Sequence, residues 1–301
     1  MKQYTSLYFV GAGGIGMSAL VRYFLAKGYK VAGYDRTQSP LTTELKTEGL
    51  EIVYEESVES IPDYCRNPET TLVVYTPAIP ASHSGLVYFR EHGFRVVKRA
   101  ELLGLITQSS RGLCFAGTHG KTTTSSMAAH IFHESPIGCN AFLGGILRNY
   151  NSNLILSEQS PFTVIEADEY DRSFHWLHPY MAVVTATDPD HLDIYGTEEA
   201  YLESFAHFTS LIQPGGCLIM KKGIRLVPNV KEGVKIYTYS ARDGGDFHAG
   251  NIRIGDGTIV FDFVTPEGVF ADIELGVPVE INIENAVAAM AIAWLNGVSG
   301  D

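Results

Sequence analysis

A glycine-rich run between an apolar segment and a helix-like segment is the feature of this sequence that most constrains its fold. The run, Gly117–Thr124 (GTHGKTTT), follows the apolar Leu113–Ala116 and precedes Ser125–Phe132. A strand, a glycine turn and a helix form a phosphate-binding loop, because glycines let backbone N–H groups approach an anion and the helix N-terminus adds a favourable dipole. Lys121 would then reach the outer phosphates, and the Thr122 hydroxyl could bind Mg²⁺.

The loop departs from the strict pattern G-x-x-x-x-G-K-[ST], because Phe115 stands where the first glycine should be. An ordinary glycine turn is the alternative interpretation. Such a turn would not require a lysine followed by three hydroxyl residues, so a nucleoside triphosphate site is the favoured prediction.

The segments before this loop alternate between strand-like and helix-like patterns. Ile15–Ala26 predicts a helix, and Gly28 stands where its C-terminus favours a left-handed residue. Alternating strands and helices predict an α/β fold with a Rossmann-like parallel sheet, and we expect this first domain over residues 1–107. Four apolar runs predict its strands: Ser6–Val10, Lys30–Tyr34, Thr71–Tyr75 and Phe94–Lys98.

A polar stretch, Gln108–Gly112, is the best candidate for a linker to a second domain, which we expect over residues 108–301. This domain is predicted to be a P-loop ATPase-like α/β unit. Besides the strand before the phosphate loop, four segments define it: the strands Phe162–Ala167 and Met181–Ala186, a small antiparallel sheet over Phe247–Leu275, and a last helix, Ile283–Leu295.

Length and charge exclude several classes of protein. A chain of 301 residues predicts two domains, and its net charge of −12 argues against a nucleic-acid partner. No apolar run approaches the roughly 18 residues of a membrane span, so we expect no membrane partner. The sequence leaves the oligomeric state open, a homodimer included. Four cysteines without CxxC spacing indicate free thiols and a cytoplasmic protein: Cys65, Cys114, Cys139 and Cys217.

A second glycine-rich loop lies near the N-terminus. Gly11, Gly13 and Gly16 fit G-x-G-x-x-G, and Asp35 ends the second predicted strand, where a dinucleotide enzyme hydrogen-bonds a ribose. Taken alone, this loop predicts an NAD-dependent dehydrogenase. A second phosphate loop about a hundred residues later argues against that reading. Two such loops suggest two different nucleotides, one of them the handle of a nucleotide sugar.

Two polar clusters follow predicted strands of the second domain. The first, Glu166–Asp171, contains four carboxylates; a solvated loop is the usual explanation, but a phosphate loop nearby favours Glu166 as a Mg²⁺ ligand. The second, Asp188–Asp193, places His191 among three aspartates, and both a structural histidine and a second metal site stay open. Ligands of open α/β sheets bind outside the carboxyl ends of strands, so we expect one shared crevice.

Seven motifs in a fixed order give the chain a family resemblance. It resembles the Mur ligases of peptidoglycan synthesis, and among them most closely the member that adds alanine. The phosphate loop fits that family's own form, G-[ST]-x-G-K-[ST]-T, which removes the objection raised by Phe115. The motifs are Gly11–Ser18 (GAGGIGMS), Tyr75–Pro80 (YTPAIP), Lys98–Leu102 (KRAEL), Gly117–Thr124 (GTHGKTTT), Glu166–Phe174 (EADEYDRSF), Asp190–Tyr195 (DHLDIY) and Asn282–Asn285 (NIEN).

The resemblance implies an ATP-dependent, ADP-forming ligase. The carboxylate of UDP-N-acetylmuramate would attack the γ-phosphate of ATP, and L-alanine would displace phosphate from the resulting acyl phosphate to form an amide. Mg²⁺ is the implied metal, and Mn²⁺ can substitute for it. Because two anions must meet, charge neutralisation and in-line positioning should dominate catalysis.

The resemblance also implies roles for single residues. Lys121, Glu166 and His191 would be catalytic; Thr122 and Glu166 would bind the metal on the ATP phosphates, and Glu166 and His191 a second metal. For Asn282 and Asn285, capping of the helix N-terminus is the simpler explanation, and both roles can hold; the part played by His119 stays open. The ATP-binding set is Gly117, Thr118, His119, Gly120, Lys121, Thr122, Thr123, Asn282 and Asn285. The UDP-sugar-binding set is Gly11, Gly13, Gly14, Ile15, Gly16, Asp35, Thr76, Ala78 and Ile79.

Three features depart from the family pattern. No lysine occurs between His191 and Lys221, so the carbamylated lysine of several related ligases has no counterpart, as the resemblance to the alanine-adding member implies. Ile281 replaces the usual histidine before the first asparagine. The family has a C-terminal ligase domain that reads the amino acid. The chain stops at Asp301, where the central domain should end, so we expect a truncated chain that ligates poorly by itself.

Three rival interpretations stay open. The recycling ligase that adds a tripeptide to UDP-N-acetylmuramate differs from this sequence after Asp171 and around His191. A dehydrogenase would leave Lys121 and Glu166 unexplained. A catalytically silent UDP-sugar-binding protein would have no need of an intact Lys121, Glu166 and His191.

Overall fold

The computed structural model describes residues 3–242 and 244–300 and divides into two compact units. Unit 1 runs to Ile106 and unit 2 begins at Thr107. The boundary lies within helix α4 (Arg99–Gln108), and β6 begins at Arg111. The predicted linker, Gln108–Gly112, is therefore mostly regular structure, with only two residues between the helix and the strand.

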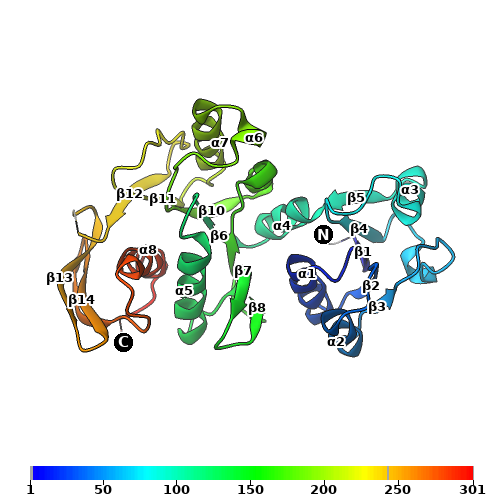
Figure 1. Cartoon of the computed structure of the whole chain (residues 1–301), viewed down its shortest axis with the longest axis horizontal. Coiled ribbons are helices and arrows are strands. Elements are labelled where there is room, and N and C mark those ends of the chain that lie inside the picture. The colour runs from blue at the N-terminus through cyan, green and yellow to red at the C-terminus, as the bar shows by residue number, and fades with distance from the viewer. Residues whose placement is uncertain (1–2, 243, 301) are drawn as a thin grey trace. The chain divides into compact units, whose positions relative to one another are not determined.

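Unit 1 is a five-stranded parallel sheet with the order β3-β2-β1-β4-β5, flanked by helices (Figure 1). The α/β prediction is confirmed, and β1, β2 and β4 have the predicted bounds. The strands are β1 (Ser6–Val10), β2 (Lys30–Tyr34), β3 (Glu51–Val53), β4 (Thr71–Tyr75) and β5 (Arg95–Lys98). The helices are α1 (Ile15–Ala26), α2 (Pro40–Glu48), α3 (Ser84–Glu91) and α4, with a 3₁₀ turn at Asp63–Cys65.

The register of unit 1 brings three strand ends to one edge. Val10 at the end of β1 pairs with Tyr34 of β2 and with Tyr75 of β4. Every residue of β1 is buried, and apart from Ser6 its side chains are apolar or aromatic, as expected for a central strand of a parallel sheet. The glycine loop after β1 therefore starts beside the residues that follow β2 and β4.

Unit 2 contains one ten-stranded mixed sheet with the order β15-β14-β13-β12-β11-β10-β6-β9-β7-β8. The predicted small antiparallel sheet is a meander of β13, β14 and β15. It forms one end of the large sheet, because β13 pairs in parallel with β12. At the other end, β8 runs antiparallel to β7. The strands are β6 (Arg111–Ala116), β7 (Asn140–Leu147), β8 (Ser152–Ile155), β9 (Phe162–Glu166), β10 (Pro179–Val184), β11 (Cys217–Lys221), β12 (Lys235–Ser240), β13 (Phe247–Gly255), β14 (Thr258–Thr265) and β15 (Gly268–Glu274).

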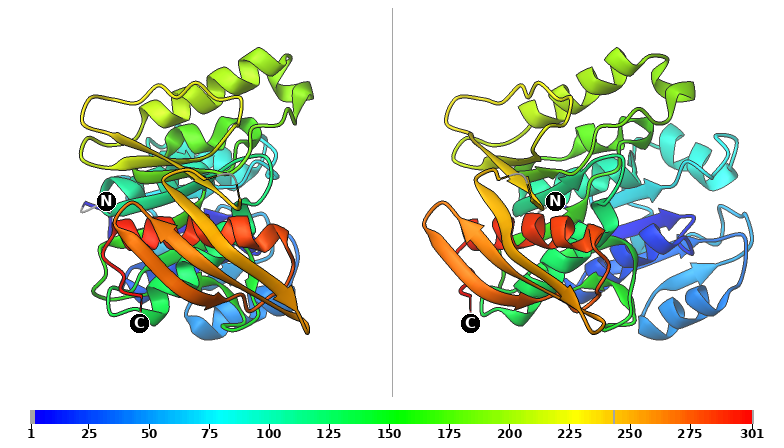
Figure 2. Two further views of the ribbon diagram at one scale, coloured as in Figure 1. Left: turned by 90° about the vertical axis from the view of Figure 1, so that its left-hand side faces the viewer. Right: turned by 60° about the vertical axis from the view of Figure 1, so that its left-hand side comes forward.

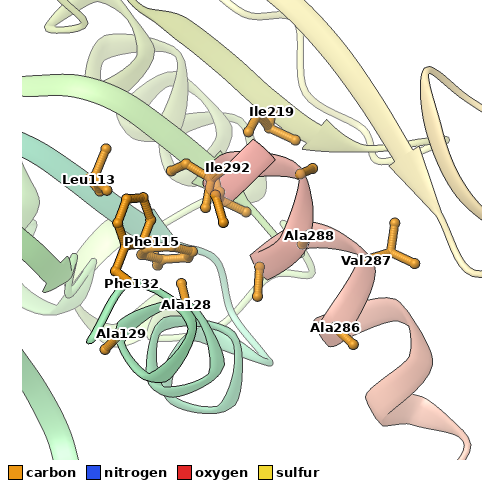
Figure 3. Packing of buried hydrophobic residues seen from close by; sticks show 14 of the residues in the cluster. Leu113, Phe115, Ala128, Ala129, Phe132, Ile219, Ala286, Val287, Ala288 and Ile292 are labelled. Carbon is orange, nitrogen blue, oxygen red and sulfur yellow. The ribbon is translucent and has the colours of Figure 1, made fainter. Parts of the chain in front are cut away.

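The helices of unit 2 are α5 (Lys121–Glu134), α6 (Leu192–Tyr195), α7 (Glu198–Ser210) and α8 (Ile281–Leu295), with a 3₁₀ segment at Tyr170–Trp176. Helices α5 and α8 pack against each other, and α8 (red in Figure 2) also lies against β12 and the orange strand β13. Their shared core is shown in Figure 3, where Phe115 of β6, Phe132 of α5 and Ile292 of α8 gather; all three are fully buried. This packing fixes the loop between β6 and α5.

The sheet of unit 2 has its topological switch point beside β6. From β6 the chain passes through α5 to β7 on one side, whereas β10, on the other side of β6, leads to β11. Phe115 of β6 pairs with Glu166 of β9, and Ala116 pairs with Val184 of β10. The segments after β6, β9 and β10 therefore leave the sheet at one edge, where ligands of such folds bind.

Two further expectations concern burial and hydropathy. The cysteines Cys65, Cys114, Cys139 and Cys217 are buried free thiols. Within residues 3–242 and 244–300, no helix has both the length and the hydropathy that crossing a bilayer requires.

Candidate active site

The phosphate loop of unit 2 is fixed against the end of β10. Gly117 has φ +140°, and a Cβ there would lie 2.7 Å from the Ala186 nitrogen and against the Thr185 hydroxyl, so only glycine fits. The Thr118 N–H donates to the Ala186 carbonyl at 3.1 Å, and the Thr185 hydroxyl donates to the His119 carbonyl. The hydrogen bond described for His119 is accepted by its backbone carbonyl, so this residue helps to shape the loop through its main chain.

The start of α5 meets the start of α8. Gly120 precedes α5 with φ +83°, and a Cβ on it would lie 3.0 Å from Asn285 Oδ1. The Thr124 hydroxyl donates to that oxygen at 3.2 Å, and Asn285 Nδ2 donates to Asn282 Oδ1 at 3.1 Å. The N-cap of α8 is Glu280, without a side-chain cap. The capping role considered for the two asparagines is therefore wrong; they join α8 to the phosphate loop instead.

Lys121, the first residue of α5, points back across its own loop. Its Nζ donates to the Gly117 carbonyl at 2.6 Å and to Glu169 Oε1 at 2.9 Å, and lies 2.8 Å from Glu169 Oε2. The Lys121 side chain is 14% exposed and that of Glu169 is 2% exposed. The charge of this lysine is therefore neutralised by a buried carboxylate from the first acidic cluster.

Glu166 lies at the end of β9 and joins two other segments. The Thr122 hydroxyl donates to Glu166 Oε1 at 3.0 Å, and the Gly144 N–H donates to Oε2 at 3.0 Å. A Cβ on Gly144 would lie 2.7 Å from the carboxylate carbon, so β7 can approach this closely only through glycine. Two oxygens, one from a hydroxyl and one from a carboxylate, thus stand together at the start of α5.

His191 introduces the short helix α6 after β10. It has φ +52°, its Nε2 lies 3.7 Å from Asp190 Oδ2, and its ring stands edge-on to Tyr170 at 5.3 Å between centroids. The described side-chain contacts of His191 are thus with its neighbour Asp190 and with Tyr170 of the first acidic cluster. In the part of the chain that the structure describes, no three His, Cys, Asp or Glu side chains are grouped to hold a metal ion.

Two tyrosines lie behind the phosphate loop. The Thr118 hydroxyl hydrogen-bonds the Tyr201 hydroxyl at 2.8 Å and donates to the Asp188 carbonyl at 2.7 Å. Tyr201 packs edge-on against Tyr195 at 4.9 Å between ring centroids. Burial raises the pKa of Tyr201, so its hydroxyl stays protonated at neutral pH. The phosphate loop therefore shares hydrogen bonds with both polar clusters at one edge of the sheet.

The glycine loop of unit 1 is closed by its own carboxylate. Gly11 has φ +91°, and a Cβ on it would lie 2.6 Å from Thr76 Cγ2 and 3.3 Å from Ile79 Cγ1. Asp35 accepts the Gly13 N–H at 2.7 Å through Oδ2 and the Thr37 N–H at 3.1 Å through Oδ1. Asp35 thus contacts the loop backbone at the position predicted to face a ribose.

The start of α1 is open on one side and covered on the other. Gly14 is the N-cap with φ −71° and no side-chain cap; a Cβ on it would meet only Met17 Cγ, at 3.9 Å. On Gly16, a Cβ would lie 3.2 Å from the guanidinium carbon of Arg99, so this arginine covers the last glycine. Of the other predicted residues, Ile15 and Ala78 are exposed.

Family models cover nearly the whole chain. Residues 6–111 match the Mur ligase family, catalytic domain, and residues 115–293 match the Mur ligase middle domain.

The chain belongs to the Mur ligase family.

Curated Mur ligases resemble the chain over its full length. It is 68% identical to the UDP-N-acetylmuramate–L-alanine ligase of Parabacteroides distasonis over 99% of the chain, and 65% identical to that of Phocaeicola vulgatus over 98%. In both comparisons the chain spans 64% of the relative's length.

Solved Mur ligase structures share the fold. The UDP-N-acetylmuramate:L-alanyl-γ-D-glutamyl-meso-diaminopimelate ligase of Neisseria meningitides superposes with a TM-score of 0.83 at 22% identity, covering 99% of this chain and 95% of that one. The UDP-N-acetylmuramate-alanine ligase of Thermotoga maritima gives 0.76 at 24% identity, covering 97% and 65%.

The candidate site contains residues that the sequence analysis did not predict. Glu169 was only one of four acidic residues, and Arg99 only part of a motif. The Gly144–Gly145 pair inside a strand was a usable signal of close backbone approach. Tyr201 gave no signal beyond its helical spacing from Phe205 and Phe208, which indicates only a buried face.

Proposed function

We propose that this Mur ligase chain carries the UDP-sugar and ATP sites of a ligase that joins the carboxylate of UDP-N-acetylmuramate to L-alanine in peptidoglycan synthesis, with ADP as product. Support comes from the relatives so named at 68% and 65% identity. The observation that carries the proposal is the convergence of Lys121, Thr122 and Glu166 on one phosphate loop. We assign ATP to unit 2 and the nucleotide sugar to unit 1.

The residues at the start of α5 fit Mg²⁺. Two adjacent oxygens of an octahedral Mg²⁺ shell are about 2.9 Å apart when each lies about 2.0–2.1 Å from the ion. Thr122 Oγ1 and Glu166 Oε1 are 3.0 Å apart. A site with one carboxylate, one hydroxyl and the ATP phosphates suits this ion, which seldom uses a cage of protein groups alone. When bound, Mg²⁺ neutralises phosphate charge and so lets an anionic carboxylate approach.

The chain's own residues would hold the reacting groups in place. The backbone N–H groups from Gly117 to Lys121 would cradle phosphate oxygens, and Lys121 would neutralise charge on the outer phosphates. The acceptor carboxylate would then attack the γ-phosphorus in line and release ADP, and the amine of alanine would displace phosphate from the resulting acyl phosphate to form the amide. Glu166, the last residue of β9, and His191, in the segment between β10 and α6, are the proposed protein ligands of a second Mg²⁺.

In unit 1, the proposed ligand is the diphosphate of the nucleotide sugar. The open side of Gly14 at the start of α1 offers room for an anion, and Arg99 beside Gly16 adds a positive charge. Thr76 and Ile79 pack on the other side of Gly11 and would border the nucleotide.

Calorimetric titrations of the 301-residue chain test the two assignments separately. The chain should bind Mg-ATP and UDP-N-acetylmuramate, each at one site, and should not bind NAD. Lys121→Ala should weaken Mg-ATP binding by about a hundredfold and leave UDP-N-acetylmuramate binding unchanged. Tight NAD binding without UDP-N-acetylmuramate binding would instead indicate the dehydrogenase.

A matched pair of variants tests the unit 1 site. Gly14→Asp puts a carboxylate into the proposed diphosphate site, yet Asp is a good N-cap and the position has room for it. Gly14→Asn has nearly the same shape without the charge. We expect only Gly14→Asp to lose UDP-N-acetylmuramate binding; equal binding by both variants would refute the placement.

A further inference from the structure

The ion pair between Lys121 and Glu169 sets a competition for the proposed ATP site. Lys121 is the cation that the proposed function assigns to the outer phosphates, yet its Nζ lies 2.9 Å and 2.8 Å from the two oxygens of Glu169. Its third close partner is the Gly117 carbonyl at 2.6 Å. The Gly117 carbonyl and Glu169 Oε1 accept two of the three N–H donors of the ammonium group, and both carboxylate oxygens lie against its charge, so a phosphate oxygen that approaches Lys121 competes with Glu169 for it.

Glu169 depends on Lys121 for its charge balance. The side chain is 2% exposed, and Oε2 accepts no hydrogen bond from the described residues. Among those residues, Lys121 is the cation recorded in contact with this carboxylate. A buried carboxylate without a cation is strongly disfavoured, so Glu169 resists every movement of Lys121 away from it.

The backbone of Glu169 is held from two directions, so the carboxylate cannot simply follow the lysine. Its carbonyl accepts the Tyr195 hydroxyl at 2.5 Å and the Arg172 N–H at 3.0 Å. Tyr195 packs on Tyr201, whose hydroxyl contacts Thr118 in the phosphate loop. Glu169 is therefore a fixed negative charge beside a loop that is built to receive another one.

We propose that Glu169 is a positioning and selectivity residue of the ATP site: its carboxylate holds Lys121 until the outer phosphates of a nucleoside triphosphate replace it. The proposal rests on the assignment of ATP to this loop. Replacement requires a ligand with more negative charge than one carboxylate, so a triphosphate displaces Glu169 more readily than a diphosphate, and a monophosphate does not reach Lys121. Glu169 thus lowers affinity for ATP and raises discrimination against shorter nucleotides.

Glu169→Gln tests this, because it keeps the shape of the side chain and removes its charge. Calorimetry on the 301-residue chain should show Mg-ATP binding about tenfold tighter and Mg-ADP binding about thirtyfold tighter, because ADP displaces the carboxylate less readily, with AMP unchanged. Glu199→Gln, on the exposed first turn of α7, makes the same charge change and should bind all three nucleotides like the unaltered chain. Unchanged or weaker Mg-ATP binding by Glu169→Gln, or equal tightening for AMP, would overturn the proposal.

A second variant decides the case if Glu169→Gln does not fold. Glu169→Asp keeps the charge but withdraws the carboxylate by one methylene, so it should bind Mg-ATP more tightly than the unaltered chain. Weaker or unchanged binding by Glu169→Asp would count against the competition. If the unaltered chain does not bind Mg-ATP, the proposed function itself fails; if it binds and neither Glu169 variant binds more tightly, only this inference fails.

Discussion

The two glycine-rich loops of the chain share a backbone design but differ in their charges. Each follows a buried strand and starts a helix, and each contains glycines that a side chain would block. In unit 1 the half-buried Asp35 accepts a loop N–H, and the first turn of α1 carries no charge of its own. In unit 2 a lysine begins the helix and a buried carboxylate holds it.

This difference teaches that the glycine pattern specifies only the backbone of an anion site. Backbone N–H groups attract any phosphate, whereas the discrimination between ligands comes from the side chains that surround the loop. A charge in a buried setting acts more strongly than the same charge near water. We therefore expect substitutions around Lys121 to have larger effects than equivalent substitutions around Gly13.

The largest expected effect is that of Lys121→Met. It leaves Glu169 buried without a cation, so the free energy of unfolding of unit 2 should fall by about 3–5 kcal/mol. Both tryptophans, Trp176 and Trp294, lie in unit 2, so urea unfolding followed by tryptophan fluorescence reports on this unit. Adding Glu169→Gln should restore most of the stability but not the ATP binding. If Lys121→Met alone were as stable as the unaltered chain, Glu169 would not depend on Lys121 for its charge balance.

The next largest effect is a change in stability when a glycine of either loop is replaced. Gly117→Ala should destabilise unit 2 by about 3 kcal/mol, because it combines strain at φ +140° with a clash against Ala186. Gly14→Asn in unit 1 should instead stabilise by a few tenths of a kcal/mol, because Asn is a slightly better N-cap than Gly and the site has space. Fluorescence would follow the first variant and circular dichroism the second. Equal losses would mean that the loops are equally constrained.

A smaller effect is expected when the charge of Asp35 is removed. Asp35→Asn keeps one acceptor for the loop, and the half-buried position is screened by solvent, so affinity for UDP-N-acetylmuramate should change by less than about threefold. Calorimetry of Asp35→Asn with UDP-N-acetylmuramate and of Glu169→Gln with Mg-ATP gives the two changes in affinity to be compared. An effect of Asp35→Asn as large as that expected for Glu169→Gln would remove the distinction between a half-buried and a buried carboxylate.

The smallest expected effect is a dependence of unit 1 on pH. Burial lowers the pKa of His83 from its ordinary 6.5, and its Nδ1 accepts the Leu86 N–H as the cap of α3. The unfolded chain therefore binds a proton more readily than the folded chain. The stability that neutral His83 provides is full above pH 6.5 and is lost as pH falls from there toward the folded pKa.

His83→Asn is the matched variant for this prediction, because Asn caps the helix without titrating. Urea unfolding of unit 1, followed by circular dichroism between pH 7 and pH 5, should show a smaller loss in the variant than in the unaltered chain. The His83 ring packs on Tyr34, whose carbonyl accepts the N–H of Gly11. If the free energy of unfolding of both proteins fell equally with pH, His83 would not be the group that destabilises unit 1 at low pH.

Sequence patterns predicted the strands better than the polar contacts. The bounds of β1 and the end of α1 before Gly28 could be predicted, because they follow from local burial and local backbone conformation. The bond between Gly144 and Glu166 links residues 22 positions apart, and that between Lys121 and Glu169 spans 48. Periodicity indicates which residues are buried but not which polar atoms meet, because that depends on how the strands are ordered in the sheet.

Helix α8 gives the Mur ligase chain a mechanical connection. The meander joins the sheet through a short ladder, in which Tyr239 pairs with Phe247 and Ser240 with His248. Helix α8 packs against both strands of that ladder, β12 and β13, and its fifth residue, Asn285, accepts a hydrogen bond from Thr124 at the end of the phosphate-loop run. Helix α8 therefore couples the two regions, so a ligand that stiffens the phosphate loop should also slow hydrogen exchange in β13 and β14.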